Sequence, residues 1–147
     1  MKNRNQETSP LKGVILFLAV IAILFLFKAK HNELDTARAA LTGLIQSNSS
    51  VQGLLNWEKL KAVGVDVGAV YLGFKTDKDR DNYKKYFIRG FSAGFKEVKG
   101  NYQEFGSWRV YEKTVQKTVV AADYRGKILL FTLPKNEKKI IEIQWKE

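Results

Sequence analysis

Few residues of this chain could carry out catalytic or metal-binding chemistry. The 147-residue sequence contains no cysteine and one histidine, His31. The lack of cysteine excludes disulfide frameworks, thiolate zinc sites, iron–sulfur clusters and thiol nucleophiles. One histidine cannot form a multi-histidine metal site or a two-histidine proton shuttle. His31 follows an apolar stretch and lies between Lys30 and Asn32, so we interpret it as a polar residue at a membrane surface; a proton switch is the alternative.

The carboxylates show one arrangement that resembles a metal site. Asp77, Asp79 and Asp81 alternate with cations, as in the first half of a calcium-binding loop. Such a loop needs a glycine at its sixth position and a bidentate glutamate at its twelfth. This sequence has Asn82 and Ile88 there. We therefore assign the aspartates to the start of a helix, where the helix dipole favours negative charge.

No nucleophile or phosphate-binding motif is present. The sequence lacks both the G-x-S-x-G elbow and the G-x-x-x-x-G-K-[ST] loop. A pair of carboxylates for glycoside hydrolysis remains an alternative, because the sequence does not give the distance between two carboxylates. The polar candidates are Asp123 and Glu142, both on expected strands, and we interpret both as outward-facing. We expect no enzyme activity, cofactor or metal; a small ligand-binding or hydrolase domain with a helix–sheet pocket is the alternative.

The most distinctive segment is a charge-free apolar run near the N-terminus. The run itself, residues 13–27, spans about 22 Å as a helix, which is somewhat short for a bilayer core of about 30 Å. Residues 11–29 span about 28 Å, which is sufficient if Lys12 and Lys28 reach the two interfaces. We predict an uncleaved transmembrane anchor. A cleaved signal peptide is the alternative, but the A-x-A pattern at residues 37–39 lies far beyond the run. The predicted anchor residues are Gly13, Val14, Ile15, Leu16, Phe17, Leu18, Ala19, Val20, Ile21, Ala22, Ile23, Leu24, Phe25, Leu26 and Phe27.

The charges on either side of this run bear on its orientation. Three Lys or Arg residues precede residues 13–27, and Lys28, Lys30 and Arg38 follow them, so the positive-inside rule gives a tie. The free amino group and the distance of Arg38 from the run favour a cytoplasmic N-terminus. We therefore expect a single-pass protein of the inner (cytoplasmic) membrane with its C-terminal domain outside the cytoplasm.

The first part of the chain beyond the run predicts helices. Residues 32–46 have Asn32 as an N-cap and apolar side chains on one face, which is typical of an amphipathic helix. A second short helix is expected over 51–63, ended by Gly64. Residues 65–74 are ambiguous, and their Val and Tyr content favours a strand.

The clearest predicted helix begins after Thr76, with Asp79 in place of the usual capping-box Glu, and ends at Gly100. One face carries large apolar side chains at helical spacing. These are Tyr83, Phe87, Phe91, Phe95 and Val98. We expect this face to pack across the inner face of a sheet. Gly90 and Gly94 lower helix propensity by about 1 kcal/mol each, which indicates a place where something approaches the helix backbone closely.

The last third of the sequence predicts strands. The expected strands are 107–113, 115–124, 127–133 and 139–146, joined by turns at Arg125-Gly126 and Pro134 to Glu137. Three or four antiparallel strands in a meander, preceded by helices, give an α+β fold. This order of elements over residues 32–147 resembles NTF2-like and cystatin-like domains, which several single-span envelope assembly proteins of bacterial secretion systems carry. The resemblance concerns the fold and assigns no function.

These elements divide the chain into four segments. A polar tail covers 1–10, the anchor 11–29, juxtamembrane helices 30–64 and an α+β domain 65–147, and the last two form one globular unit. We expect a non-enzymatic scaffold or assembly component of a bacterial-type envelope complex. The alternative is a cytoplasm-facing basic domain that binds nucleic acid or anionic lipid at the membrane.

The charge balance bears on partners. The sequence has 25 Lys and Arg residues against 15 Asp and Glu. A basic domain near a bilayer is drawn to anionic lipid or wall polymers within a Debye length of about 8–10 Å. Besides the lipid bilayer and these polymers, we expect protein partners in a membrane complex. Nucleic acid ranks lower, because the aromatic residues are expected in the core. The candidate interaction surface comprises Gly90, Gly94, Lys85, Arg89 and Lys96.

Overall fold

The structure is a computed structural model and describes residues 33–146. The predicted anchor, residues 11–29, and His31 lie outside the described residues. Contrary to the single-pass transmembrane prediction, no helix in the described part of the chain is long and apolar enough to cross a bilayer. The chain beyond residue 32 forms one compact unit.

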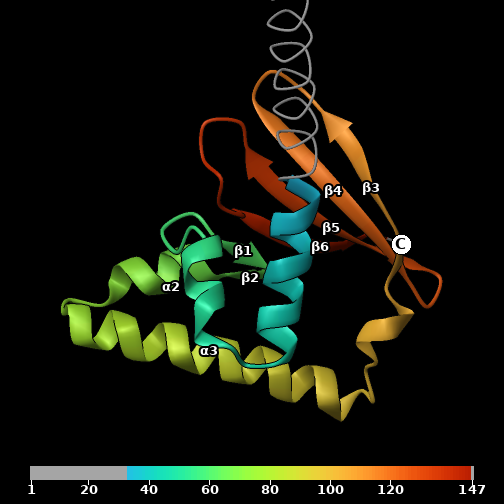
Figure 1. Ribbon diagram of the computed structural model, residues 1–147. Coiled ribbons are helices and arrows are strands. Elements are labelled where there is room, and N and C mark those ends of the chain that lie inside the picture. Colours follow the sequence, from blue (N-terminus) through green and yellow to red (C-terminus); the bar gives the residue numbers. More distant parts are fainter. Residues whose placement is uncertain (1–32, 147) are drawn as a thin grey trace, which may run out of the picture. The chain divides into compact units, whose positions relative to one another are not determined.

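The sheet has six strands in the order β2-β1-β6-β5-β4-β3 (Figure 1). Their bounds are β1 (Lys61–Ala62), β2 (Val65–Asp66), β3 (Gly106–Lys113), β4 (Lys117–Tyr124), β5 (Lys127–Pro134) and β6 (Glu142–Lys146). Every neighbouring pair is antiparallel except β1 and β6, which run parallel. The α+β class is seen, but the predicted three- to four-stranded antiparallel meander, NTF2-like or cystatin-like in outline, is wrong. Strands β3 to β6 form a meander that β1 and β2 extend into a mixed sheet.

The helical segments are residues 33–45, η1 (Ser49–Leu54), α2 (Val67–Gly73), α3 (Asp77–Glu97) and η2 (Tyr102–Glu104). Two predictions are wrong here. Residues 51–63 are not one helix, because the 3-10 turn η1 ends and the chain enters β1. Residues 65–74 are not one strand, because the Asp66 side chain accepts a hydrogen bond from the backbone N–H of Ala69 and so caps α2.

Helix α3 begins as predicted. The Thr76 hydroxyl accepts from the Asp79 backbone N–H (3.1 Å) and donates to the Asp79 carboxylate (2.6 Å). The end of the helix differs in detail, because Lys99 rather than Gly100 takes the left-handed conformation, with φ 52°. The Gly100 N–H then donates to the Phe95 carbonyl (2.8 Å), which closes the last turn.

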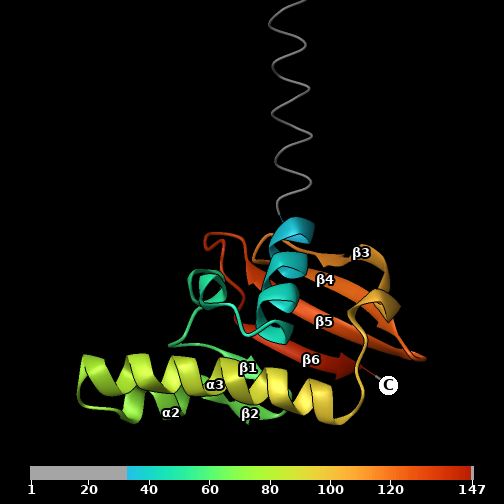
Figure 2. The same cartoon turned by 60° about the horizontal axis from the view of Figure 1, so that its bottom comes forward.

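The helix of residues 33–45 lies across the inner face of the sheet, in front of β4 and β5 (Figures 1 and 2). Its side chains Ala37, Ala40, Leu41 and Leu44 are all at most 1% exposed. They share one core with buried residues of the sheet and of the other helical segments. The sheet residues in this core are Ala62, Val120, Ala122, Tyr124, Leu129, Phe131, Leu133 and Ile143. The prediction that α3 covers the inner face is therefore wrong.

Helix α3 instead lies along the end of the sheet formed by β1 and β2 (Figure 2). Its aromatic residues Tyr83, Phe87, Phe91 and Phe95 are half-buried against the common core. The Ser92 hydroxyl donates to the Ile45 carbonyl (2.6 Å) and fixes α3 to the end of the 33–45 helix. Val98, the fifth predicted member of the aromatic face, is 64% exposed, since it follows the last residue of the helix.

An ion pair holds the loop between β5 and β6 against the segment after η1. The Glu137 carboxylate accepts hydrogen bonds from the Lys59 ammonium (2.7 Å) and from the Asn56 side-chain amide. The Lys59 ammonium, followed by the Asn56 amide, holds the pKa of Glu137 below its ordinary value. A lowered carboxyl pKa contributes stability above the unfolded pKa of about 4.3, and that stability is lost as the pH falls through the folded pKa.

Replacing Glu137 by glutamine should therefore flatten the loss of stability below about pH 5. The free energy of unfolding, measured by urea denaturation from neutral to acid pH, should fall less steeply than in the wild type. Glu97→Gln is the control, because Glu97 forms no ion pair among residues 33–146. If the free energy of unfolding fell equally steeply with decreasing pH in Glu137→Gln and in the wild type, this account would be contradicted.

Candidate functional site

An apolar groove of about 320 Å³ lies between the β1–β2 hairpin and α3. Its lining comprises Ala62, Val63, Val65, Tyr83, Tyr86, Phe87, Gly90 and Phe91. Every one of these residues is uncharged, and only the two tyrosines bring a polar side-chain group. Val63, Val65 and Tyr86 are also large apolar residues with 47%, 52% and 75% of their surface exposed. The groove is therefore a hydrophobic surface open to solvent.

The hairpin wall of the groove contains a strained residue. Val63 and Gly64 form the two-residue turn between β1 and β2, with φ 50° and 82°. Turns of this kind favour Asn-Gly, because both central residues need positive φ. The left-handed conformation costs an ordinary L-residue about 1–2 kcal/mol, and it is exceptional for a β-branched one. Strained backbone residues concentrate at functional sites, and here the strain places a valine side chain at the groove.

The helical wall of the groove is supported from behind. The Phe87 ring contacts Trp57 edge-on, with ring centroids 5.8 Å apart, and lies 6.5 Å from the Phe91 ring. Burial raises the pKa of the Tyr83 phenol, which reflects the apolar surroundings of this wall. Tyr86 is 75% exposed, more than the lining residues Val63 and Val65. The helical wall is thus packed against Trp57 at Phe87 and exposed to solvent at Tyr86.

The two predicted glycines of α3 occupy different places. A Cβ atom on Gly90 or on Gly94 would meet no other atom within 4 Å. Neither glycine is therefore required by packing inside the described domain. The open space at Gly90 belongs to the groove, whereas Gly94, one turn further, is not part of its lining.

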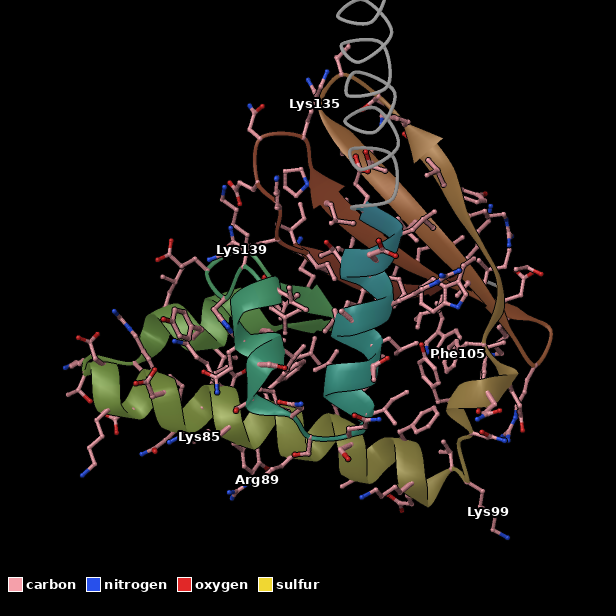
Figure 3. All side chains as sticks on the ribbon, viewed as in Figure 1. Lys85, Arg89, Lys99, Phe105, Lys135 and Lys139 are labelled. Atoms are coloured by element: carbon pink, nitrogen blue, oxygen red, sulfur yellow. The ribbon has the colours of Figure 1, made fainter. Side chains whose placement is uncertain are left out.

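The predicted basic residues lie on an exposed side of α3. Figure 3 shows Lys85 and Arg89 projecting from α3 away from the sheet. Lys96 is exposed on the same side, and so is Lys78, which the sequence analysis did not include. At about 100° per residue, the spacing of these four residues places them within about 40° around the helix. We call Lys78, Lys85, Arg89 and Lys96 the basic row; none of them forms an ion pair with another residue of the described domain.

The polar candidates Asp123 and Glu142 do not come together. Asp123 pairs with Arg109 (2.9 Å), and Glu142 accepts a hydrogen bond from the Thr132 hydroxyl (3.4 Å). Their neighbours on the intervening strand β5 are Ile128 and Thr132. Those two positions are about 13 Å apart along a strand. Asp123 and Glu142 therefore do not form a carboxylate pair.

The aspartates that resemble a calcium loop are used by α3 itself. Asp77 pairs with Arg80 (3.6 Å) and Asp81 with Lys84 (3.0 Å), while Asp79 completes the cap described above. Within residues 33–146 no group of three or more His, Cys, Asp or Glu side chains could hold a metal ion. The acidic run thus serves the start of the helix.

A second hollow, of about 350 Å³, lies between the segment after η1, α2 and α3. It is lined by Leu55, Asn56, Trp57, Glu58, Tyr71, Lys84 and Lys139. Both signs of charge face it, and its Lys84 is already paired with Asp81. It offers neither a continuous apolar surface nor a cluster of unpaired charge, so it is the weaker candidate.

Sequence reasoning identified one wall of the groove and missed the other. It singled out Gly90 and the aromatic face of α3 but neither Val63 nor Val65 as a site residue. A signal was available, because a residue followed by glycine between two β-type stretches is typical of a two-residue hairpin. Gly64, predicted as the end of a helix, is instead the second residue of this hairpin turn.

Comparison of the chain with protein-family models, with curated proteins and with solved structures finds no match in any of the three.

Proposed function

We propose that residues 33–146 form a non-enzymatic interaction domain, a scaffold or assembly component that holds a partner protein in the groove between the β1–β2 hairpin and α3. The observation that carries this proposal is the apolar lining, exposed at Val63, Val65 and Tyr86. Contiguous exposed apolar surface is uncommon on monomeric proteins and marks interaction sites.

The lining favours a polypeptide over a small metabolite. Small-molecule sites combine an apolar wall with a few polar groups that fix the orientation of the ligand. This groove has no charged side chain and no amide side chain in its lining. Protein interfaces, in contrast, place aromatic residues such as tyrosine at the centre of apolar patches. The lining has four aromatic residues, Tyr83, Tyr86, Phe87 and Phe91, and so matches that composition.

The partner is held by side-chain insertion rather than by strand addition. Strand β2 is the edge of the sheet next to the groove, but it contains only two residues. Strand addition derives its affinity from main-chain hydrogen bonds along an edge, and two residues provide few of them. An apolar side chain from the partner can instead enter the space beside Gly90.

A photo-reactive phenylalanine derivative in place of Tyr86 tests this proposal in the source cell. We expect a discrete adduct with a second protein. Val115, which is 80% exposed in the turn before β4, provides the matched control position. The adduct should be absent there, and Gly90→Trp should abolish it at position 86 by filling the groove. The same adduct at both positions, or none at position 86, would overturn the proposal.

Replacing Val63 by asparagine should separate binding from stability. Asparagine tolerates the left-handed conformation, so the free energy of unfolding should rise by about 1 kcal/mol. The adduct at position 86 should weaken at the same time, because a polar side chain replaces part of the apolar wall. Urea denaturation and the cross-linking yield give the two readouts. An unchanged yield in a stabilised variant would show that Val63 has no part in binding.

A further inference from the structure

The central part of α3 carries only positive charge. Residues 82–96 contain no Asp or Glu, and they include Lys84, Lys85, Arg89 and Lys96. Lys84 is neutralised by Asp81. The remaining three belong to the basic row, which is exposed and without ion-pair partners in the described domain. A row of unpaired cations on one side of a helix repels other cations and attracts an anionic surface.

The basic row and the groove meet on α3. Tyr86 lies at the groove rim and Arg89 in the basic row, and residues three apart are neighbours on a helix surface. A partner that fills the groove and covers Tyr86 therefore lies beside Arg89. Lys85 and Lys96 extend the positive surface on that side, toward either end of the helix. The two features together form one surface with an apolar edge and a basic edge.

We infer that the partner segment is an acidic amphipathic helix that lies along α3, with apolar side chains in the groove and carboxylates against the basic row. This inference rests on the proposed function of the groove. Charge complementarity requires the partner surface that faces the basic row to be negatively charged. The open space at Gly90 lets a second helix approach α3 at the 8–10 Å typical of packed helices. The row spans about 27 Å, which an acidic helix of about five turns matches.

A polyanion would use this surface differently. A nucleic acid or an anionic lipid surface would be attracted to the row alone, and its affinity would depend on salt. It would not require an apolar groove, and it would be indifferent to a bulky residue at position 90. The apolar lining beside the cations favours a protein partner, and the two cases are separable by experiment.

The test uses the full chain and three synthetic helical peptides with the same apolar positions. The positions that flank the apolar face are Glu in the first peptide, Gln in the second and Lys in the third. Fluorescence anisotropy at low salt should show the Glu peptide binding at least tenfold more tightly than the Gln peptide. This difference should shrink at 1 M salt, where the Debye length is about 3 Å. Gly90→Trp should weaken binding of both peptides.

Charge reversal provides the decisive variant. Lys85→Glu combined with Arg89→Glu should invert the preference, so that the Lys peptide binds more tightly than the Glu peptide. The matched control is Lys135→Glu combined with Lys138→Glu, in the exposed loop after β5, which should leave the preference unchanged. Unaltered binding of the Gln peptide shows that the groove of the reversed variant is intact.

The outcomes distinguish failure of this inference from failure of the proposed function. Equal binding of Glu and Gln peptides, both sensitive to Gly90→Trp, would overturn the acidic partner and leave the groove as a binding site. Binding of duplex DNA or phosphatidylserine vesicles that depends on Lys85 and Arg89, with no preference for the Glu peptide, would overturn it in favour of a polyanion. Failure of every peptide to respond to Gly90→Trp, together with no adduct at position 86, would remove the proposed function itself.

Discussion

Replacing Phe131 by alanine is expected to lower the free energy of unfolding by about 3–5 kcal/mol. Phe131 lies on β5, is fully buried, and has Val120 of β4 and Ile143 of β6 as its neighbours across the sheet. Its ring stacks on Trp108 of β3, with centroids 5.9 Å apart. One side chain thus joins four strands to the helix of residues 33–45. Its loss leaves a cavity that the rigid sheet cannot close.

Urea denaturation of the variant and the wild type measures this loss. Tyr86→Ala is the matched control, because it removes an aromatic ring that is 75% exposed. Surface substitutions of that kind usually change stability by no more than about 0.5 kcal/mol. The contrast also shows whether Tyr86 variants retain their fold for binding experiments. A similar, small loss in both variants would mean that the common core is not centred on β5.

The strands that sequence reasoning located are the longer ones, β3 to β6, each with at least five residues. Strands β4 and β5 have eight residues each, and β3 has eight as well. Strands β1 and β2 have two residues each, which is shorter than any detectable period. Their place in the sheet is set by distant partners, since β1 pairs in parallel with β6. The mixed character of the sheet therefore could not be derived from local patterns.

The size of the apolar side chains decides which helix covers the sheet. The helical spacing of apolar residues does not, because both helices have it. Both the 33–45 helix and α3 have an apolar face. The former presents Ala37 and Ala40 beside its leucines, so its backbone can approach the sheet closely. Helix α3 presents large rings such as Phe87 and Phe91, which stay half-buried at the edge of the core. The large aromatic area of α3 favoured it as the covering helix, but the smaller side chains of the 33–45 helix allow that helix to cover the sheet.

The candidate site was predictable on one side only. Glycines in the middle of α3 lower helix propensity with no local benefit, and that was enough to single out Gly90. The opposite wall depends on the hairpin around Val63, which comes next to α3 only after the chain has folded. Segment 65–74 shows the same limit, because the capping of α2 by Asp66 outweighs the strand propensity of Val and Tyr.

Replacing Gly68 by alanine should lower the free energy of unfolding by about 1–3 kcal/mol. A Cβ atom at position 68 would lie 2.5 Å from the Glu58 carbonyl oxygen, which belongs to backbone and cannot rotate away. The Gly68 N–H also donates to the Leu60 carbonyl (2.9 Å), so α2 is held against the segment that leads into β1. Separating the two segments to admit a methyl group weakens this hydrogen bond and shifts the hairpin wall of the groove.

Gly90→Ala is the matched substitution, and its expected sign is opposite. Both glycines lie inside helices, so helix propensity alone predicts that alanine stabilises each by up to about 1 kcal/mol. Position 90 has open space for the methyl group, and this gain should appear there in urea denaturation. At position 68 the steric clash with the Glu58 carbonyl should outweigh the gain in helix propensity. Stabilisation by both substitutions would show that α2 is not packed against the Glu58 backbone, and the support of the groove's hairpin wall would need another explanation.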